Sequence, residues 1–262
     1  MSVFLGDRTL SRGPPTGPWS SAALVLAVAL AIVLLATAAG FGAAAAFDAW
    51  ARIDEPRAFA AGEIPALLTA RVSFSLVAFQ CITVLLVFVA NGRLRLPDTW
   101  FIRFGMPRGG ITTLFIAVLT LLALAGIYGG LIYAFDKEAF GHDIRPFAEL
   151  MKSRTWWLLL LAAGVGAPLA EECLFRGLLY GALRRTPFGL AGASLVTAVM
   201  WALLHANYSV YGLVAITLIG LYLAFLRERT GTLLTPIVSH GAYNSLIVLA
   251  LAFAPESFLS VG

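Results

Sequence analysis

Residues 186–226 read TPFGLAGASLVTAVMWALLHANYSVYGLVAITLIGLYLAFL and contain no Asp, Glu, Lys or Arg. A single helix of this length would measure about 60 Å, roughly twice the hydrocarbon thickness of a bilayer. The polar residues His-Ala-Asn-Tyr-Ser at 205–209, together with Gly212, interrupt the run near its middle. The stretch therefore predicts two membrane-spanning helices that meet at this polar break.

Other charge-free runs have the length of single membrane crossings, which need about 20 mostly apolar residues. They cover residues 13–47, 72–92, 109–135, 155–170 and 230–255. The run at 155–170 is long enough only if its helix continues through three charged residues to about Leu183. Together these runs predict seven spans, over residues 20–46, 67–90, 111–135, 156–183, 189–205, 210–227 and 233–254.

The composition is typical of an integral membrane protein. Of the 262 residues, 60% are hydrophobic and 12% are charged, whereas soluble domains carry about 25% charged residues. This balance excludes a soluble enzyme, a disordered chain and a disulfide scaffold. The long continuous runs do not fit the short alternating strands of a membrane barrel. We therefore expect an all-α, polytopic transmembrane helix bundle.

The loops predict the orientation. If the N-terminus is cytoplasmic, the inner segments carry more arginine and lysine than the outer ones, which favours this topology. The net charge of +4 belongs to these loops and needs no nucleic-acid partner. Residues 1–19 are expected to form a flexible tail. The loops 48–66 and 136–155 are expected to be solvated connectors, with His142 at the surface.

One predicted span carries three charges, in the sequence EECLFR at residues 171–176. A charge inside a span costs at least about 2.5–3.5 kcal/mol on insertion scales, so such residues usually mark a functional interior. Glu172 and Arg176 are four residues apart and share a helix face, which favours an ion pair. Glu171 lies about 100° further round the helix and stays free for another task. The alternative is a buried ion network that only fixes helix packing.

Two more spans carry histidines. His205 ends the fifth span, four residues after Trp201, which is expected to pack beside it. His240, in the seventh span, shares a helix face with Asn244. A glutamate with a histidine can deprotonate a water that attacks a carbonyl, and a second histidine with an amide can stabilise the oxyanion. Glu171, His205 and His240 could equally bind a divalent metal such as zinc, with a water in the open position. Both interpretations predict hydrolysis of an amide bond.

The other polar residues of the spans have simpler interpretations. Cys81 and Cys173 lie in predicted spans without a metal-binding or disulfide pattern, and we interpret Cys173 as a small hydrophobic residue. Arg71, near the start of the second span, is expected to snorkel to the interface along its long stem. The alternative for Arg71 is a counter-ion inside the bundle.

Three motifs lie on separate predicted helices: Glu171-Glu172-x-x-x-Arg176, Trp201-x-x-x-His205 and His240-x-x-x-Asn244, the last preceded by Thr235-Pro236. In order and spacing they resemble the CPBP (CAAX protease and bacteriocin-processing, or Abi) family of intramembrane proteases. The resemblance covers residues ~155–250, the four C-terminal spans. One position departs from the pattern, because the second motif of the family usually begins with Phe. The resemblance implies a protease core over 151–262, with its active site buried in those spans, and a variable helical region over 20–150.

This resemblance implies proteolysis of a membrane protein, or of a lipidated or peptide substrate, in a bacterial-type plasma membrane. The first glutamate would activate water with the histidine of the second motif, and the histidine and asparagine of the third would stabilise the oxyanion. Metal-dependent and metal-independent mechanisms both stay open. The alternatives to proteolysis are a non-catalytic immunity or scaffold protein on the same fold and an ion transporter. The expected catalytic residues are Glu171, Glu172, His205, His240 and Asn244, with structural support from Arg176 and Trp201.

Overall fold

The computed structural model describes residues 18–54, 64–93 and 103–253. Within these ranges the chain forms helices and no strand, which confirms the predicted all-α bundle. A composite helix in the middle of the chain runs without interruption over Trp156–Leu183. The other helices are α1 (Pro18–Asp54), α3 (Ile64–Arg93), α4 (Gly110–Phe135), α5 (Lys137–Met151), α9 (Gly189–Leu203), α10 (Val210–Thr230) and α11 (Leu234–Ala252).

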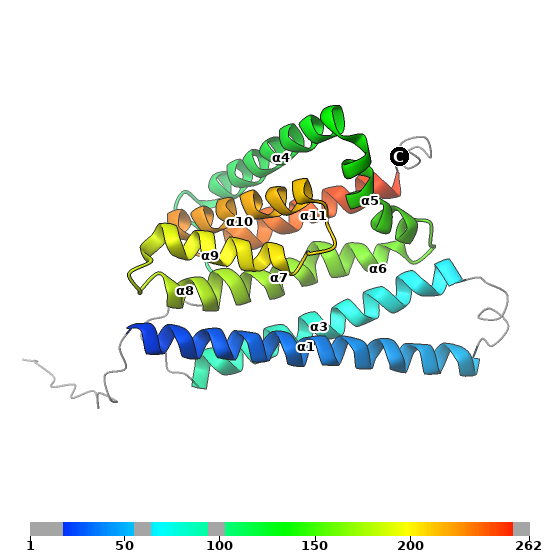
Figure 1. The fold of residues 1–262 in the computed structure, drawn as a ribbon, viewed down its shortest axis with the longest axis horizontal. Coiled ribbons are helices and arrows are strands. Elements are labelled where there is room, and N and C mark those ends of the chain that lie inside the picture. The colour runs from blue at the N-terminus through cyan, green and yellow to red at the C-terminus, as the bar shows by residue number, and fades with distance from the viewer. Residues whose placement is uncertain (1–17, 55–63, 94–102, 254–262) are drawn as a thin grey trace, which may run out of the picture.

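The helices are stacked in layers, and the composite helix lies in the middle layer (Figure 1). The antiparallel pair α1 and α3 packs on one side of it, and α9, α10 and α11 pack on the other, with α4 outermost against α10 and α11. The composite helix is the most enclosed of the spanning helices, with half of its most apolar stretch buried inside the bundle. The helix that carries three charges is therefore the one most shielded from the surroundings.

In the described part of the chain, six helices are long and apolar enough to cross a membrane, judged by length and composition. The fifth predicted span is shorter than expected, because α9 has 15 residues and ends at Leu203. At 1.5 Å per residue it measures about 22 Å, less than the roughly 30 Å of a hydrocarbon core. Residues 204–209 form the predicted break, and α10 begins at Val210. We therefore expect this turn, with His205, to lie within the membrane and not at its surface.

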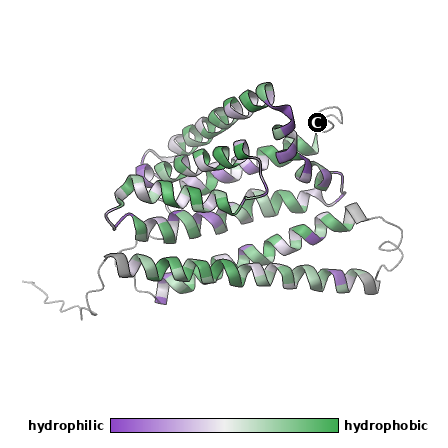
Figure 2. Cartoon of the chain, viewed as in Figure 1, coloured by the Kyte–Doolittle hydropathy of each residue, from purple (hydrophilic) through white to green (hydrophobic). Residues whose placement is uncertain are grey.

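The predicted connector 136–155 is largely helical, which corrects the expectation of a solvated loop. Its helix α5 begins after Asp136, whose side chain accepts a hydrogen bond from the Ala139 N–H at 2.9 Å and caps the N-terminus. Ala148 and Met151, three residues apart, are buried, while hydrophilic residues are concentrated on this helix (Figure 2). His142 is exposed, as predicted. This amphipathic helix packs along one end of the bundle.

The first two long helices extend beyond the predicted spans. α1 continues to Asp54 and includes residues 18 and 19 of the predicted tail, while residues 1–17 and 55–63 lie outside the described part of the chain. Arg71 of α3 donates from Nε to Asp48 Oδ1 of α1 at 2.7 Å. The two side chains are 40% and 25% exposed. Arg71 therefore has the counter-ion of the alternative interpretation, at a partly exposed position.

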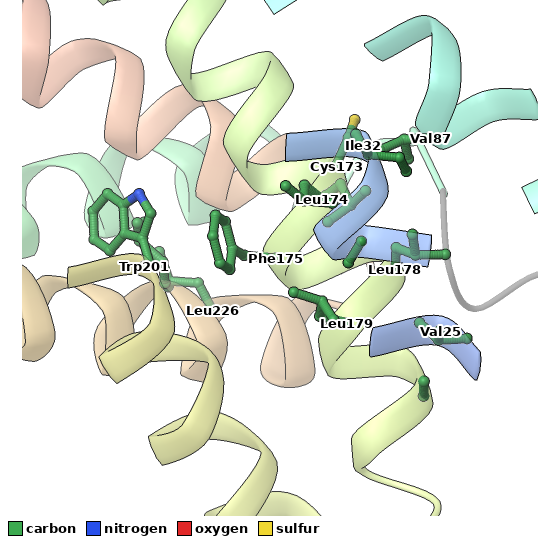
Figure 3. Close-up of a cluster of buried hydrophobic side chains, with 14 of the residues drawn as sticks. Val25, Ile32, Val87, Cys173, Leu174, Phe175, Leu178, Leu179, Trp201 and Leu226 are labelled. Carbon is green, nitrogen blue, oxygen red and sulfur yellow. The ribbon is translucent and has the colours of Figure 1, made fainter. Parts of the chain in front are cut away.

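A buried apolar cluster holds the composite helix against α1 and α3 (Figure 3). Cys173 and Leu178 of the composite helix pack in this cluster with Val25 of α1 and Val87 of α3. Cys173 is a free, fully buried thiol, so its predicted role as a small hydrophobic residue is confirmed. Close packing is a main source of helix association inside a membrane, where burial of apolar surface contributes little.

Two glycines allow α11 to pack closely against the composite helix near Glu171 and Glu172. A Cβ on Gly241 would lie 2.6 Å from the carbonyl oxygen of Gly164, so no larger residue fits there without a shift of the helices. Gly164 is in turn packed against the Ser245 side chain of α11. Small residues at helix crossings allow such close backbone contact in membranes. The contact brings His240, the neighbour of Gly241, beside the two glutamates.

Candidate active site

The glutamates lie on a short α-helical piece between two π-helical segments of the composite helix. α7 (Ala167–Glu172) follows α6 (Trp156–Leu161) and the π-helix η1 (Ala162–Gly166), and precedes the π-helix η2 (Cys173–Leu179) and α8 (Tyr180–Leu183). π-helical turns have i→i+5 hydrogen bonds and occur frequently at functional sites. All seven residues of η2 are buried. The sequence predicted one regular helix, which differs from this observed geometry.

Glu172 forms the predicted ion pair with Arg176. Arg176 donates from Nη1 to Glu172 Oε1 at 2.9 Å, and both side chains are fully buried. Arg176 also donates from Nη2 to the carbonyl oxygen of Gly220 in α10, at 3.1 Å. A side chain at Gly220 would crowd this guanidinium. The pair therefore ties the composite helix to α10 from inside the bundle.

Glu171 has a different environment from its neighbour. Its side chain is 21% exposed, whereas that of Glu172 is fully buried. Trp201 of α9 donates from Nε1 to Glu171 Oε2 at 2.6 Å. His240 Nε2 lies 4.0 Å from the same oxygen, beyond hydrogen-bond distance. Of the two adjacent carboxylates, only that of Glu171 is open to a water or substrate.

Both ring nitrogens of His240 already have partners. Nδ1 lies 3.0 Å from Glu172 Oε1, and because an ionised carboxylate only accepts, Nδ1 carries the proton. Asn244 Nδ2 lies 2.9 Å from the Ala163 carbonyl oxygen and 3.1 Å from His240 Nε2, so it donates one proton to each. The predicted oxyanion donors are thus brought together next to Glu171, but their N–H groups are engaged in this arrangement.

His205 follows α9 in the 204–209 turn, with one ring nitrogen fixed. Its Nδ1 lies 3.0 Å from the carbonyl oxygen of Trp201, which can only accept, so Nδ1–H is the donor. In the neutral ring, Nε2 then carries the lone pair. The ring also packs edge-to-face on Tyr208, with 5.8 Å between centroids. His205 therefore presents a nitrogen that can take or give a proton.

Trp201 contacts four residues of the constellation, namely Glu171, His205, His240 and Arg176. Its ring centroid lies 5.5 Å from that of His205, which confirms the predicted packing, and 5.2 Å from that of His240. The Arg176 guanidinium carbon lies 4.6 Å from the indole centroid, within the range of a cation–π contact. The hydrogen bond to Glu171 was not foreseen, because the aromatic position was expected only to pack. The residue type could have indicated this hydrogen bond, because tryptophan is the only apolar aromatic residue with a side-chain N–H.

The sequence left metal binding open, with Glu171, His205 and His240 as the ligands if a metal is bound. In the described part of the chain, no three His, Cys, Asp or Glu side chains are arranged to hold a metal ion. His240 has its Nδ1–H on Glu172, and its Nε2 receives the Asn244 N–H, so neither nitrogen offers a lone pair to a metal. The residues as placed therefore do not fit a metal.

The turn that carries His205 is fastened to α5 by residues that the sequence did not single out. Asp143 accepts hydrogen bonds from the Ser209 backbone N–H at 2.6 Å and from the Ser209 hydroxyl at 2.7 Å. The neighbouring His142 donates from Nε2 to the Asn207 carbonyl oxygen at 3.1 Å. No sequence motif predicts these contacts. They form only because α5 is a helix, and this stretch was predicted to be a loop.

Replacing Asp143 with alanine is expected to loosen the 204–209 turn. The change removes two hydrogen bonds to Ser209, each worth about 1–3 kcal/mol where a charged acceptor is involved. Amide hydrogen exchange over residues 204–209 should accelerate at least about fivefold, which corresponds to roughly 1 kcal/mol. Asp136→Ala, which removes the cap of the same helix without touching the turn, is the matched control. Unchanged exchange in the Asp143 variant would contradict the role of α5 as an anchor.

Comparison with known proteins covers this same region. Residues 153–246 match the model of the family described as type II CAAX prenyl endopeptidase Rce1-like. Over this segment the chain resembles the Rce1-like endopeptidases. The segment starts just before α6 and ends within α11, so it contains all three motifs. The resemblance to CAAX-type membrane proteases is therefore confirmed for the helices that build the site.

Two curated proteins are similar to this chain over segments of nearly equal length. "Putative membrane peptidase YdiL" of Bacillus subtilis (strain 168) is 32% identical over 93 residues, which are 35% of this chain and 36% of the relative. "Uncharacterized 24.3 kDa protein" of Escherichia coli is 34% identical over 94 residues, 35% of this chain and 43% of the relative. The match thus spans less than half of each relative. No solved structure gives a significant match. With six helices of spanning length in its described part and a segment that resembles membrane proteases, the chain is an integral, multi-pass membrane protein.

Proposed function

We propose that the protein is an intramembrane endopeptidase that hydrolyses a peptide bond with water activated by Glu171. One observation carries the proposal: the two adjacent carboxylates have opposite environments. Glu172 is fully buried and paired with Arg176, whereas Glu171 is partly exposed and held by one N–H. Titratable neighbours whose environments differ in this way commonly divide the roles of reacting and supporting group. The match of residues 153–246 to a membrane endopeptidase family supports the same reaction class.

In the proposed reaction, Glu171 takes a proton from a water while the water oxygen attacks the carbonyl carbon of the scissile bond. The carbon–nitrogen bond then breaks, and the leaving nitrogen receives the proton that Glu171 took from water, either directly or through His205. The Nδ1–H of His205 is held by a backbone carbonyl, so its Nε2 is the nitrogen that would exchange this proton. General acid–base catalysis of this kind contributes about 10²–10⁴-fold to a rate.

His240 and Asn244 would stabilise the oxyanion after one change of protonation. As long as His240 Nε2 is unprotonated, it accepts the Asn244 N–H. A proton taken up by Nε2 from solvent before the attack, and kept through the reaction, would turn that nitrogen into a donor and displace the amide, so both groups would become free to donate to a developing negative charge. Glu172 Oε1, which accepts from His240 Nδ1, would balance the imidazolium.

The proposed substrate is a membrane protein or a lipidated or peptide substrate that reaches the site within a bilayer. The turn with His205 follows a helix too short for a full crossing, which supports chemistry below the membrane surface. We place the protein in a bacterial-type plasma membrane with its N-terminus in the cytoplasm, because the positively charged loops favour that orientation. Residues 151–262 would form the protease core. Residues 20–150 would form a variable region of transmembrane helices that precedes it.

The experiment that tests the proposal compares the termini of membrane proteins, by mass spectrometry, in cells producing the wild type or Glu171→Gln. Termini that require the wild type identify substrates and cleavage sites. We expect His205→Gln to lose the same termini, and Glu149→Gln, a change at an exposed carboxylate outside the site, to keep them.

Identical termini with wild type and Glu171→Gln, at equal protein levels, would contradict the proposal. A cellular phenotype that survives both Glu171→Gln and His205→Gln would then favour a non-catalytic immunity or scaffold protein. Ion flux through the purified protein in liposomes would favour a transporter. These outcomes separate the three function classes.

A further inference from the structure

The two oxygens of the Glu171 carboxylate have different surroundings. Oε2 accepts the Trp201 indole N–H in a short hydrogen bond of 2.6 Å. In the described part of the chain, the hydrogen bond to this carboxylate goes to Oε2 and none goes to Oε1, and the side chain is 21% exposed. One oxygen is therefore held by the protein, and the other is open.

The donor itself is held firmly in place. Trp201 is 3% exposed, and its ring is packed between His205 and His240, with centroids at 5.5 and 5.2 Å. The Arg176 guanidinium lies against the same ring at 4.6 Å. An indole enclosed in this way has no room to turn its N–H elsewhere. Its direction therefore fixes the rotation of the Glu171 carboxylate.

We infer that Trp201 is a positioning residue whose indole N–H selects Oε1 of Glu171 as the oxygen that takes the proton from water. This inference rests on the proposed function, in which Glu171 is the base. Without the N–H, the carboxylate can rotate about its last bond, and either oxygen can turn toward the water or away from it.

The test replaces Trp201 with β-(3-benzothienyl)alanine, which keeps the bicyclic shape and exchanges the N–H for sulfur. The purified full-length protein in nanodiscs cleaves the peptide identified by the comparison of termini, and kcat and KM are measured separately. We expect kcat to fall about tenfold to a hundredfold, the range of a hydrogen bond to a charged group, with KM within about twofold. A role in packing alone predicts an unchanged kcat, because the shape is kept. Trp201→Phe, which also lacks the N–H, should lose at least as much.

A second readout does not depend on activity. In ¹⁵N-indole-labelled protein, the Trp201 cross-peak is assigned by its loss in Trp201→Phe. We expect this peak to move in Glu171→Gln and to stay in place in Glu149→Gln, an exposed carboxylate paired with Lys152. An unmoved peak in Glu171→Gln, or wild-type kcat in the benzothienyl variant, overturns the inference. A wild type that cleaves nothing overturns the proposed function instead, so the two failures are distinguishable.

Discussion

The Glu171→Gln variant is expected to cleave its membrane substrate about a thousandfold more slowly than the wild type, with little change in KM. Glutamine has nearly the same shape and can still accept the Trp201 N–H through its amide oxygen, but it cannot take a proton from water. Loss of a general base typically costs about 10²–10⁴ in rate. The measurement is single-turnover cleavage by purified protein in nanodiscs, with equal folded fractions confirmed by thermal unfolding.

Glu149→Gln is the control for this variant. It makes the same chemical change at a carboxylate that is 65% exposed and lies outside the site. We expect its cleavage rate to equal that of the wild type. A fall of similar size in both variants would mean that removing any carboxylate charge slows cleavage. The effect of Glu171→Gln would then not show that Glu171 is the base.

The Arg176→Met variant is expected to be destabilised by about 3–5 kcal/mol, the usual cost of leaving one member of a buried ion pair without its partner. Methionine keeps the apolar stem but leaves Glu172 Oε1 without its guanidinium donor and Gly220 without its bond from Nη2. Unfolding of detergent-solubilised protein, followed by circular dichroism with increasing denaturing detergent, measures the change.

Two further variants make this prediction specific. Arg184→Met removes an ion pair with Glu228 in which both side chains are about a quarter exposed, and should cost no more than about 1 kcal/mol. Adding Glu172→Leu to Arg176→Met should restore part of the lost stability, because the unpaired buried charge is then gone. Equal losses for Arg176→Met and Arg184→Met would contradict a structural role for the buried pair.

Helix positions could be predicted from the sequence because a bilayer imposes a length on every apolar run. The break at 205–209 was visible for the same reason, since a 41-residue charge-free run exceeds one crossing. The Glu172–Arg176 pair was predictable because spacing on one helix fixes a shared face. These features depend on local sequence and on the membrane, and both can be known without tertiary contacts.

The remaining features depend on contacts between distant segments. Helix α5 was missed because its stretch mixes charges and lacks a long apolar run, so its burial against the bundle decides its structure. The π-helical segments were missed because a sequence pattern does not distinguish them from α-helix. That both His240 nitrogens are engaged, one by Glu172 of another helix, follows from the close crossing at Gly164 and Gly241. Motif spacing alone placed these side chains together without showing which atoms are free.

The central claim, that the Glu171 carboxylate is the base, is tested most directly by chemical rescue. Cleavage by Glu171→Ala in nanodiscs is measured with excess formate and, as a control, with chloride at the same ionic strength. We expect the variant to be about a thousandfold slower than the wild type, and formate, but not chloride, to restore the rate about tenfold or more by supplying a carboxylate. Cleavage by Glu171→Ala at the wild-type rate, in the absence of formate, would contradict the claim.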